Sequence, residues 1–216
     1  MINTLLFDFD GTLVDSEVLH FQCWAQVLAP FAIELEEESF CRQYSGRPTL
    51  ASAFDMVQKY ALDADGKDLA AQKNALFTQI AVHVLPPLLP HVEQVLSQAH
   101  NDGFTLALVT GSTRDEVTPI LEGYGFTHLF KTIVTKDDVH NPKPHPEPYR
   151  LALSRLGVQP YNALAIEDTY TGSRSAKDAA LSVYVVPNKY TQEQDFTHVD
   201  GVFSDLKKMY ATLTKP

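Results

Sequence analysis

The chain has 216 residues, of which 44% are hydrophobic and 20% charged, enough for one large domain or for a core with a small second domain. Its 27 acidic residues outnumber its 17 basic ones, and the net charge of −10 argues against nucleic acid and anionic membranes as partners. A phosphorylated substrate is still compatible with this charge, because a bound divalent cation can reverse the local sign.

Cysteine content and the absence of targeting patterns indicate the compartment. Cys23 and Cys41 are too few for a disulfide framework, and we expect both to be reduced and buried. No signal-peptide pattern is visible, and no apolar run approaches the roughly 18 residues of a membrane span. The sequence therefore predicts a cytoplasmic protein. It sets no oligomeric state, and a monomer is compatible with it.

The first predicted element is a short buried strand that ends in two aspartates. An apolar run leads into Asp8-Phe9-Asp10, and a glycine and a threonine follow at once. The carboxyl edge of a parallel α/β sheet is where ligands bind. There Asp8 can serve as a carboxylate nucleophile and Asp10 as a general acid and base. Taken alone, the pattern also fits a strand end with two solvated acids.

Residues 15–85 are predicted to be almost wholly helical. Apolar residues follow a helical spacing around residues 24–31, 53–61 and 69–80, and no strand-like alternation interrupts them. Three prolines within residues 86–90 then break the helical pattern and stiffen the chain. We therefore expect a helical insertion directly after the first strand.

From residue 91 onward, predicted helices and strands alternate. Thr113 and Glu116 have the spacing of a capping box, and Pro119 is expected to make that helix short or late in starting. The expected helices are 91–102, Glu116–Tyr124, Pro146–Leu156, Thr171–Ala180 and Ser204–Leu213, and the expected strands are Phe104–Thr110, Thr132–Thr135, Ala163–Glu167 and Ser182–Val186.

This alternation implies a parallel sheet with helices on both faces. The expected fold class is therefore α/β, with a Rossmann-like parallel sheet core and an inserted α-helical cap domain. We assign residues 1–14 and 86–216 to the core and residues 15–85 to the cap. A lid inserted after the first strand would sit over the carboxyl edge of the sheet.

Two further segments place phosphate-binding groups at that edge. The strand before residue 110 ends in Thr110-Gly111-Ser112, whose hydroxyl and N–H groups can hold phosphate oxygens, although Ser and Thr are also common helix caps. Lys143 stands among alternating prolines that restrict the backbone, so that it can present a fixed charge to phosphate. Its alternative interpretation is a solvated loop lysine.

A last segment adds acids. The strand Ala163–Glu167 runs into Asp168, and Gly172 and a helix follow. Magnesium prefers such hard oxygen ligands, although Asp168 could partly be a helix N-cap. Acids, a hydroxyl, a lysine and acids again thus converge on one edge, a combination that fits phosphoryl transfer.

In this order, the four motifs resemble those of the haloacid dehalogenase-like (HAD) superfamily of phosphotransferases, over nearly the whole chain. The resemblance implies that Asp8 is the nucleophile, that Asp10 is the general acid and base, and that Thr110 and Lys143 bind the phosphate with Gly111 and Ser112.

The resemblance also implies a Mg²⁺ cofactor. The carboxylates of Asp8 and Asp168 and the backbone carbonyl of Asp10 would suit this ion, with Glu167 binding directly or through water. An acid at the position of Asp10 sets the chain apart from the dehalogenase, phosphonatase and P-type ATPase branches. A phosphatase or a phosphomutase remains.

Three residues of the cap are candidates for substrate binding. His20 lies about one helical turn beyond Ser16 and resembles a histidine of β-phosphoglucomutase, although a satisfied or solvent-facing histidine is also compatible. Lys73 resembles a cap lysine of the mutase, and Arg47 follows a glycine in a possible substrate loop. The mutase carries an arginine close to where Thr49 stands, and this chain has Arg47 instead, a departure that counts against a mutase grip on a second phosphate.

The leading interpretation is a Mg²⁺-dependent phosphatase that hydrolyses a small phosphorylated metabolite, a sugar phosphate, through an aspartyl-phosphate. One alternative is a phosphomutase like β-phosphoglucomutase. The other is a non-catalytic binding protein on the same fold, which the cost of unused clustered carboxylates disfavours.

Overall fold

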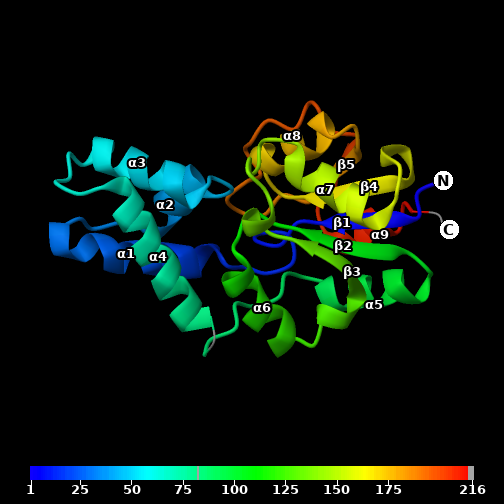
Figure 1. The fold of residues 1–216 in the computed structure, drawn as a ribbon, viewed down its shortest axis with the longest axis horizontal. Helices are drawn as coiled ribbons and strands as arrows, with labels where there is room; N and C mark the ends of the chain where they lie inside the picture. Colours follow the sequence, from blue (N-terminus) through cyan, green and yellow to red (C-terminus); the bar gives the residue numbers. More distant parts are fainter. Residues whose placement is uncertain (82, 214–216) are drawn as a thin grey trace.

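The computed structural model describes residues 1–81 and 83–213 and shows a six-stranded parallel sheet flanked by helices (Figure 1). The strand order is β3-β2-β1-β4-β5-β6, and every pair is parallel. This is the predicted α/β class. The strands are β1 (Thr4–Phe7), β2 (Thr105–Val109), β3 (Phe130–Val134), β4 (Ala163–Glu167), β5 (Ser182–Val185) and β6 (Gly201–Val202).

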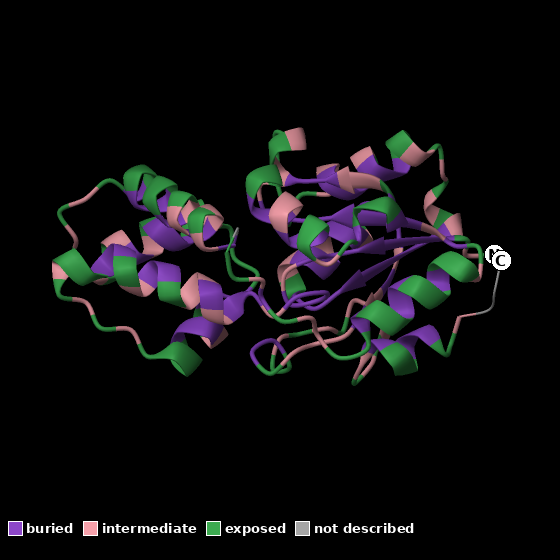
Figure 2. Cartoon of the chain, turned by 90° about the horizontal axis from the view of Figure 1, so that it is seen from below, coloured by how far each residue is buried: buried purple, intermediate pink, exposed green. Residues whose placement is uncertain are grey.

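The central strand β1 is buried on both faces. Leu5 and Phe7 pack into one hydrophobic cluster and Leu6 into another, because successive side chains of a strand point to opposite faces. Figure 2 shows the buried strands between outer helices whose far sides are exposed. In register, Phe7 pairs with Leu108 on β2 and with Ile166 on β4. The chain segments that follow these three strands therefore begin at the same level of one edge.

In the described residues from 91 onward the structure has five α-helices, and two of them differ from the expectation. The helix at Arg114 does not start late, because the Thr113–Glu116 capping box fixes its beginning and Pro119 is accommodated inside it. The last helix is shorter than predicted and begins after its cap, Asp205. The helices are α5 (Val92–Asn101), α6 (Arg114–Gly123), α7 (Glu147–Leu156), α8 (Tyr170–Asp178) and α9 (Leu206–Tyr210).

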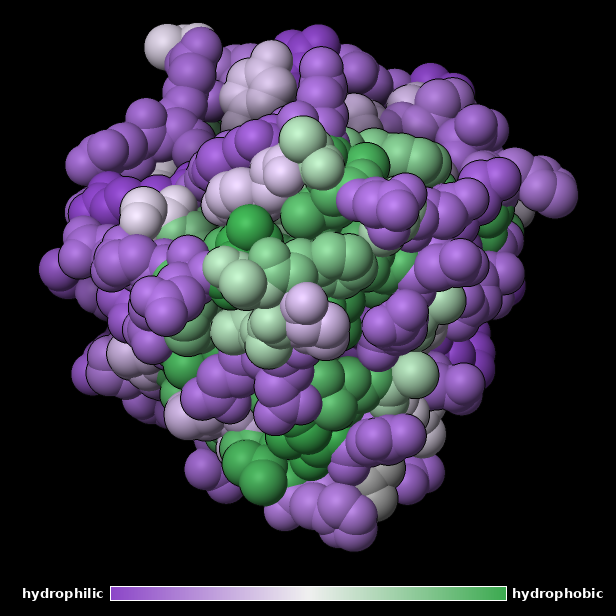
Figure 3. All heavy atoms as spheres, turned by 90° about the vertical axis from the view of Figure 1, so that its left-hand side faces the viewer, coloured by the Kyte–Doolittle hydropathy of each residue, from purple (hydrophilic) through white to green (hydrophobic). Residues whose placement is uncertain are grey.

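Four helices between β1 and α5 form a separate lobe beyond the carboxyl edge of the sheet (Figure 1). They are α1 (Glu17–Leu28), α2 (Glu37–Tyr44), α3 (Thr49–Lys59) and α4 (Gly66–Ala81), and we call them the helical lobe. The lobe has its own hydrophobic cluster around Trp24, Leu28 and Met56. Figure 3 shows its outer face, where hydrophobic side chains gather at the centre and hydrophilic ones surround them.

Several smaller expectations are also answered. Cys23 and Cys41 are buried free thiols, as predicted. None of the helices in the described part of the chain has the length and apolarity needed to cross a bilayer. Short 3₁₀ helices lie at Ala29–Phe31, Thr127–Leu129, Lys136–Asp138 and Pro160–Asn162.

Candidate active site

Asp8 and Lys143 form the centre of the candidate site. Lys143 Nζ lies 2.6 Å from Asp8 Oδ1 and 2.6 Å from Glu167 Oε1, and it also donates to the carbonyl of Val109 at 2.8 Å. The lysine thus joins the ends of β1, β2 and β4. All its donors are engaged and its side chain is almost fully buried. Burial would lower the pKa of Lys143, but the two carboxylates raise it above its ordinary value, so the lysine is a permanent cation.

A buried acidic cluster surrounds this cation. Asp8, Glu167 and Asp168 each place a carboxylate oxygen within 4.8 Å of the others. Burial and the charge of Glu167 raise the pKa of Asp8 to about 7, and burial and the charges of Asp8 and Glu167 raise the pKa of Asp168 well above its usual range. One lysine does not balance three acids, so the site has the charge that a divalent cation would neutralise.

The surroundings of this cluster fit a bound metal. Among the described residues, Glu167 Oε2 is buried and has no hydrogen-bond partner. Its other oxygen accepts from Tyr149 Oη at 2.6 Å as well as from Lys143. A side chain at Gly172 would overlap the Glu167 carboxylate, and one at Gly11 would overlap that of Asp168. Both glycines therefore let the backbone approach the acids closely.

Asp168 is not the helix cap that one interpretation of the sequence suggested. Thr169 caps α8 instead, because its hydroxyl accepts from the N–H of Gly172. The Asp168 carboxylate accepts from Thr12 Oγ1 at 3.3 Å and from Asn188 Nδ2 at 2.9 Å. Its orientation is thus set by two neighbouring loops rather than by the helix.

Asp10 lies at the rim of the same edge and is held by hydroxyl groups. Ser16 Oγ and Ser112 Oγ each donate to its carboxylate at 2.6 Å, and Thr110 Oγ1 lies 3.5 Å away. His20 Nε2 lies 3.6 Å from Asp10 Oδ1. Burial would raise the pKa of Asp10, but these contacts outweigh burial and hold it below its ordinary value. Asp10 is therefore an ionised acceptor in the substrate-free protein.

A cavity of about 390 Å³ opens over Asp8 and Asp10, between the sheet edge and the helical lobe. This volume falls in the range of small-molecule sites, about 300–1,000 Å³. Of the residues predicted for phosphate or substrate binding, all except Thr110 line it: Gly111, Ser112, Lys143, His20, Arg47 and Lys73.

The three lobe residues have different environments. His20 stacks on Phe77 with ring centroids 4.4 Å apart and faces Asp10. Arg47 packs over the Tyr44 ring and lies 3.4 Å from Asp55, at the half-exposed mouth of the cavity. Lys73 is only 1% exposed, and its Nζ lies 3.3 Å from Glu116 Oε1 on α6. The charge of Lys73 is therefore already paired with a carboxylate of α6.

We expect replacement of Lys73 by methionine to destabilise the protein by about 3–5 kcal/mol, because it leaves Glu116 buried without its main partner. The double variant Lys73→Met/Glu116→Gln should recover much of this loss. Chemical denaturation measures both, and Arg174→Met, which breaks an exposed pair with Asp178, serves as a control without measurable change. Additive losses in the double variant would contradict the pairing.

The sequence analysis did not single out Glu17, Tyr149 and Asn188. Glu17 lines the cavity and lies one turn before His20 on the same face of α1, a spacing that could have indicated it. Burial and the charge of Asp10 raise the pKa of Glu17 to about 8. Tyr149 and Asn188 reach the acids from α7 and from the loop after β5, and no sequence signal marks them.

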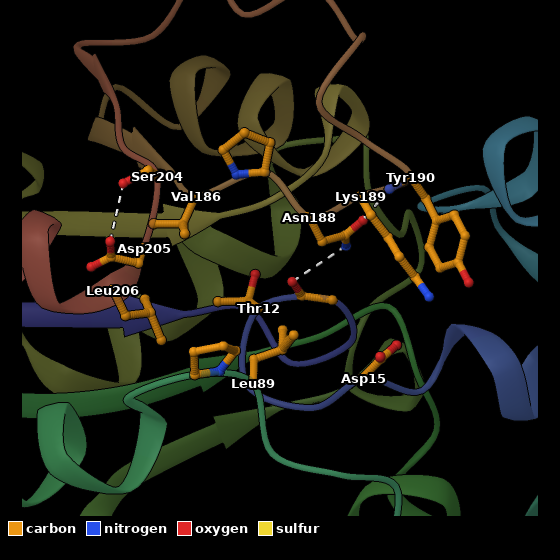
Figure 4. Close-up of a pocket in the computed structure, with 13 residues that line it drawn as sticks. Thr12, Asp15, Leu89, Val186, Asn188, Lys189, Tyr190, Ser204, Asp205 and Leu206 are labelled. Atoms are coloured by element: carbon orange, nitrogen blue, oxygen red, sulfur yellow. Dashed lines mark hydrogen bonds between the residues drawn. The ribbon is translucent and has the colours of Figure 1, made fainter.

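A second cavity, of about 280 Å³, is lined by Asn188 and its neighbours in the chain (Figure 4). Figure 4 shows Asn188, Lys189 and Tyr190 along one side of it and Leu89 and Thr12 along another. It is lined by the segments that connect the sheet to the helical lobe, around Asp15 and Pro90.

Comparisons with known proteins agree with this geometry. Residues 5–186 match the family model of the haloacid dehalogenase-like hydrolases. The chain is 30% identical to protein CbbY of Rhodobacter capsulatus, across 95% of this chain and 94% of that protein. It is 37% identical to the pyrophosphatase PpaX of Bacillus pumilus, across 78% and 76%, and 29% identical to the fructose-1-phosphate phosphatase YqaB of Escherichia coli, across 82% and 92%.

Among solved structures, a variant of CbbY from Rhodobacter sphaeroides in complex with xylulose-(1,5)bisphosphate superposes with a TM-score of 0.83. It is 26% identical, and the match covers 99% of this chain and 96% of that one.

Proposed function

The chain belongs to the haloacid dehalogenase-like hydrolases and is a phosphatase of this family, and from this premise we propose that its substrate is a sugar phosphate hydrolysed on Asp8 with the help of Mg²⁺. The observation that carries the proposal is the Asp8–Lys143 contact of 2.6 Å on the floor of the 390 Å³ cavity, with Asp10 at its rim. A nucleophile, a fixed cation and a proton carrier thus face one space.

Mg²⁺ fits the donor set of Asp8, Glu167 and Asp168, because it prefers carboxylate oxygens and the Glu167 Oε2 atom lacks a partner among the described residues. The backbone carbonyl of Asp10 completes the proposed set. When bound, the ion neutralises phosphate charge and keeps Asp8 in its ionised, nucleophilic form.

In the first half of the reaction, Asp8 attacks phosphorus in line, and Asp10 gives a proton to the leaving sugar oxygen. Asp10 is ionised in the free protein, so it takes up this proton when the phosphate binds, because a neighbouring negative charge raises the pKa of a carboxyl group. Lys143 stabilises the transferring group. In the second half, Asp10 deprotonates a water molecule that attacks the aspartyl-phosphate.

The helical lobe supports a sugar as the leaving group. We propose that residues 15–85 act as a cap over residues 1–14 and 86–216, and that the cap binds the sugar. Glu17, Ser52 and Asn74 place polar groups on the cap side of the cavity, and Arg47 adds a cation at its mouth. A polar wall suits hydroxyl groups, which an apolar wall would leave unpaired.

Glu17 gives this proposal a pH signature. With its pKa near 8, Glu17 is largely protonated at neutral pH and can donate a hydrogen bond to a substrate oxygen. The charges of Asp10 and Asp15 oppose its ionisation, and that of Lys73 favours it.

We expect the free energy of unfolding of the metal-free protein to fall between pH 5 and 8 through Glu17. The folded state holds a proton that the unfolded chain, with a glutamate pKa of 4.5, has released, so each pH unit costs at most about 1.4 kcal/mol. Glu17→Gln should remove this contribution, while Glu38→Gln on the exposed side of α2 should not. Denaturation at pH 5.5 and 7.5 measures the difference, and parallel pH profiles of Glu17→Gln and wild type would contradict it.

The deciding experiment is phosphate release from a panel of sugar phosphates with Mg²⁺. We expect fast release from one preferred sugar phosphate. A phosphomutase is the second candidate, because the 3.6 Å contact of His20 with Asp10 could hold the acid and base away from water. Little release with rapid isomerisation of β-glucose 1-phosphate, given traces of the bisphosphate, would favour the mutase. Mg²⁺ binding without turnover of any phosphoester would instead favour a binding protein.

A further inference from the structure

The loop after β5 joins the acidic cluster to the helical lobe. Asn188 Nδ2 donates to Asp168 Oδ2 at 2.9 Å and lies 3.5 Å from the carbonyl of Gly11. Two residues later, Tyr190 is only 5% exposed and belongs to the hydrophobic cluster of the lobe. The loop thus has one end on a proposed metal ligand and the other inside the lobe. Figure 4 shows Asn188, Lys189 and Tyr190 in succession along it.

Tyr190 is anchored in the lobe and contacts α2. Its ring packs in the cluster that contains Phe40 and Cys41, and its hydroxyl lies 3.4 Å from Glu37 Oε1. Farther along the same loop, Glu193 pairs with Arg42 of α2 at 3.1 Å. The loop is therefore attached to the lobe at two points, the buried Tyr190 ring and the Glu193–Arg42 ion pair on the surface.

Local hydrogen bonds connect the two ends, which are separated by Lys189 alone. The Asn188 side-chain oxygen accepts from the N–H of Tyr190 at 2.8 Å, and the N–H of Asn188 donates to Thr191 Oγ1 at 3.0 Å. The amide of Asn188 is thus fixed from both sides, with its oxygen on the Tyr190 backbone and its nitrogen on Asp168. Because the Asn188 side-chain oxygen is bonded to the Tyr190 N–H, a displacement of the Tyr190 backbone pulls on the Asn188 amide.

A cavity lies beneath this loop. The cavity has a volume of about 280 Å³, and it is lined by Asn188 and Lys189 of the loop and by Leu89 and Leu206. On this side the loop borders the cavity, and the contacts of Asn188 and Tyr190 anchor it at its two ends.

We propose that Asn188 is a positioning residue for Asp168 and that Tyr190 couples it to the helical lobe, so that the position of the lobe sets the orientation of this metal-binding carboxylate. The inference rests on the proposed metal site. A change in lobe position then changes the affinity for the metal, and metal binding changes the preferred lobe position by the same free energy, because a coupling between two sites acts equally in both directions.

The test is the dissociation constant of Mg²⁺, measured by calorimetry without substrate. Asn188→Ala should weaken binding about 10-fold or more, as is typical when a partner of a metal ligand is lost. Tyr190→Ala should weaken it several-fold, and the double variant should bind no more weakly than Asn188→Ala alone, since Tyr190 acts through Asn188. Tyr161→Ala, at an exposed tyrosine of the Pro160–Asn162 turn, is the matched control.

Unchanged Mg²⁺ affinity in Tyr190→Ala, or multiplied effects in the double variant, would overturn the proposal. If Tyr190→Ala fails to fold, insertion of two glycines between Lys189 and Tyr190 keeps the anchor in place and lengthens the connection. This insertion should weaken Mg²⁺ binding as Asn188→Ala does, and wild-type affinity would overturn the coupling.

Failure of the metal assignment is distinguishable from failure of the coupling. A wild-type protein that binds no Mg²⁺ contradicts the proposed cofactor. The coupling is then judged by hydrogen exchange of the metal-free protein, in which Asn188→Ala should speed exchange in α2. Unchanged exchange in α2 would overturn the coupling.

Discussion

Asp8→Asn is expected to reduce phosphate release by about 10⁴-fold or more, because an amide cannot form the aspartyl-phosphate. Asparagine has nearly the same size, and it removes one of three crowded buried acids around Lys143. The metal-free variant should therefore be at least as stable as wild type, since burial and the charge of Glu167 already disfavour the ionised form of Asp8.

Phosphate release and thermal unfolding together check this prediction. Asp63→Asn, at an exposed position between α3 and α4, is the control that should change neither. Activity within tenfold of wild type would exclude Asp8 as the nucleophile. Loss of both activity and folded structure would instead show that Asp8 is needed for the fold, which its environment does not predict.

Lys143→Met is expected to have the largest combined effect on stability and activity. It removes the cation that contacts both Asp8 and Glu167 at 2.6 Å and leaves buried negative charge without its partner. Breaking a buried pair in this way costs about 3–5 kcal/mol. Phosphate release should fall about 10²–10³-fold, as it does when a group that stabilises transition-state charge is lost.

The loss of stability should depend on conditions in a defined way. Added Mg²⁺ should restore part of it, because the ion supplies positive charge to the same carboxylates. Low pH should also reduce it, since protonation of Asp8 removes one of the repelling charges; Lys143 lowers the pKa of Asp8, so its loss makes this protonation easier. Denaturation with and without Mg²⁺ at pH 5.5 and 8 measures both effects. Lys131→Met, at an exposed position of β3, is the control, and equal losses under all conditions would contradict the electrostatic cause.

Local pattern was sufficient for most of the fold. β4 was predicted to the residue, and α5 and α7 to within one residue, because apolar periodicity and flanking turn residues mark their limits. The start of α6 was wrong because the capping box outweighed the effect of Pro119. The two-residue strand β6 was missed, because its existence depends on pairing with β5 and not on its own residues.

For the site, too, the sequence predicted some features and the tertiary structure alone revealed others. The sequence placed Asp8, Asp10, Lys143 and the Glu167-Asp168 pair at the ends of neighbouring segments, and parallel register brings them to one edge. Their roles as nucleophile, acid and metal ligands stay predictions that the variants above test. The pairing of Lys73 with Glu116 could not be foreseen, because it joins residues 43 positions apart on the helical lobe and α6.

The sequence alone therefore determined the class of fold, the order of its elements and the chemical groups brought to the sheet edge, since these follow from short-range periodicity and from the rule that parallel strands share an edge. Only the tertiary structure decided which charges are paired and which pKa values are shifted. Burial and distance between segments far apart in the chain set both, as for Lys143 beside Asp8 and Lys73 beside Glu116.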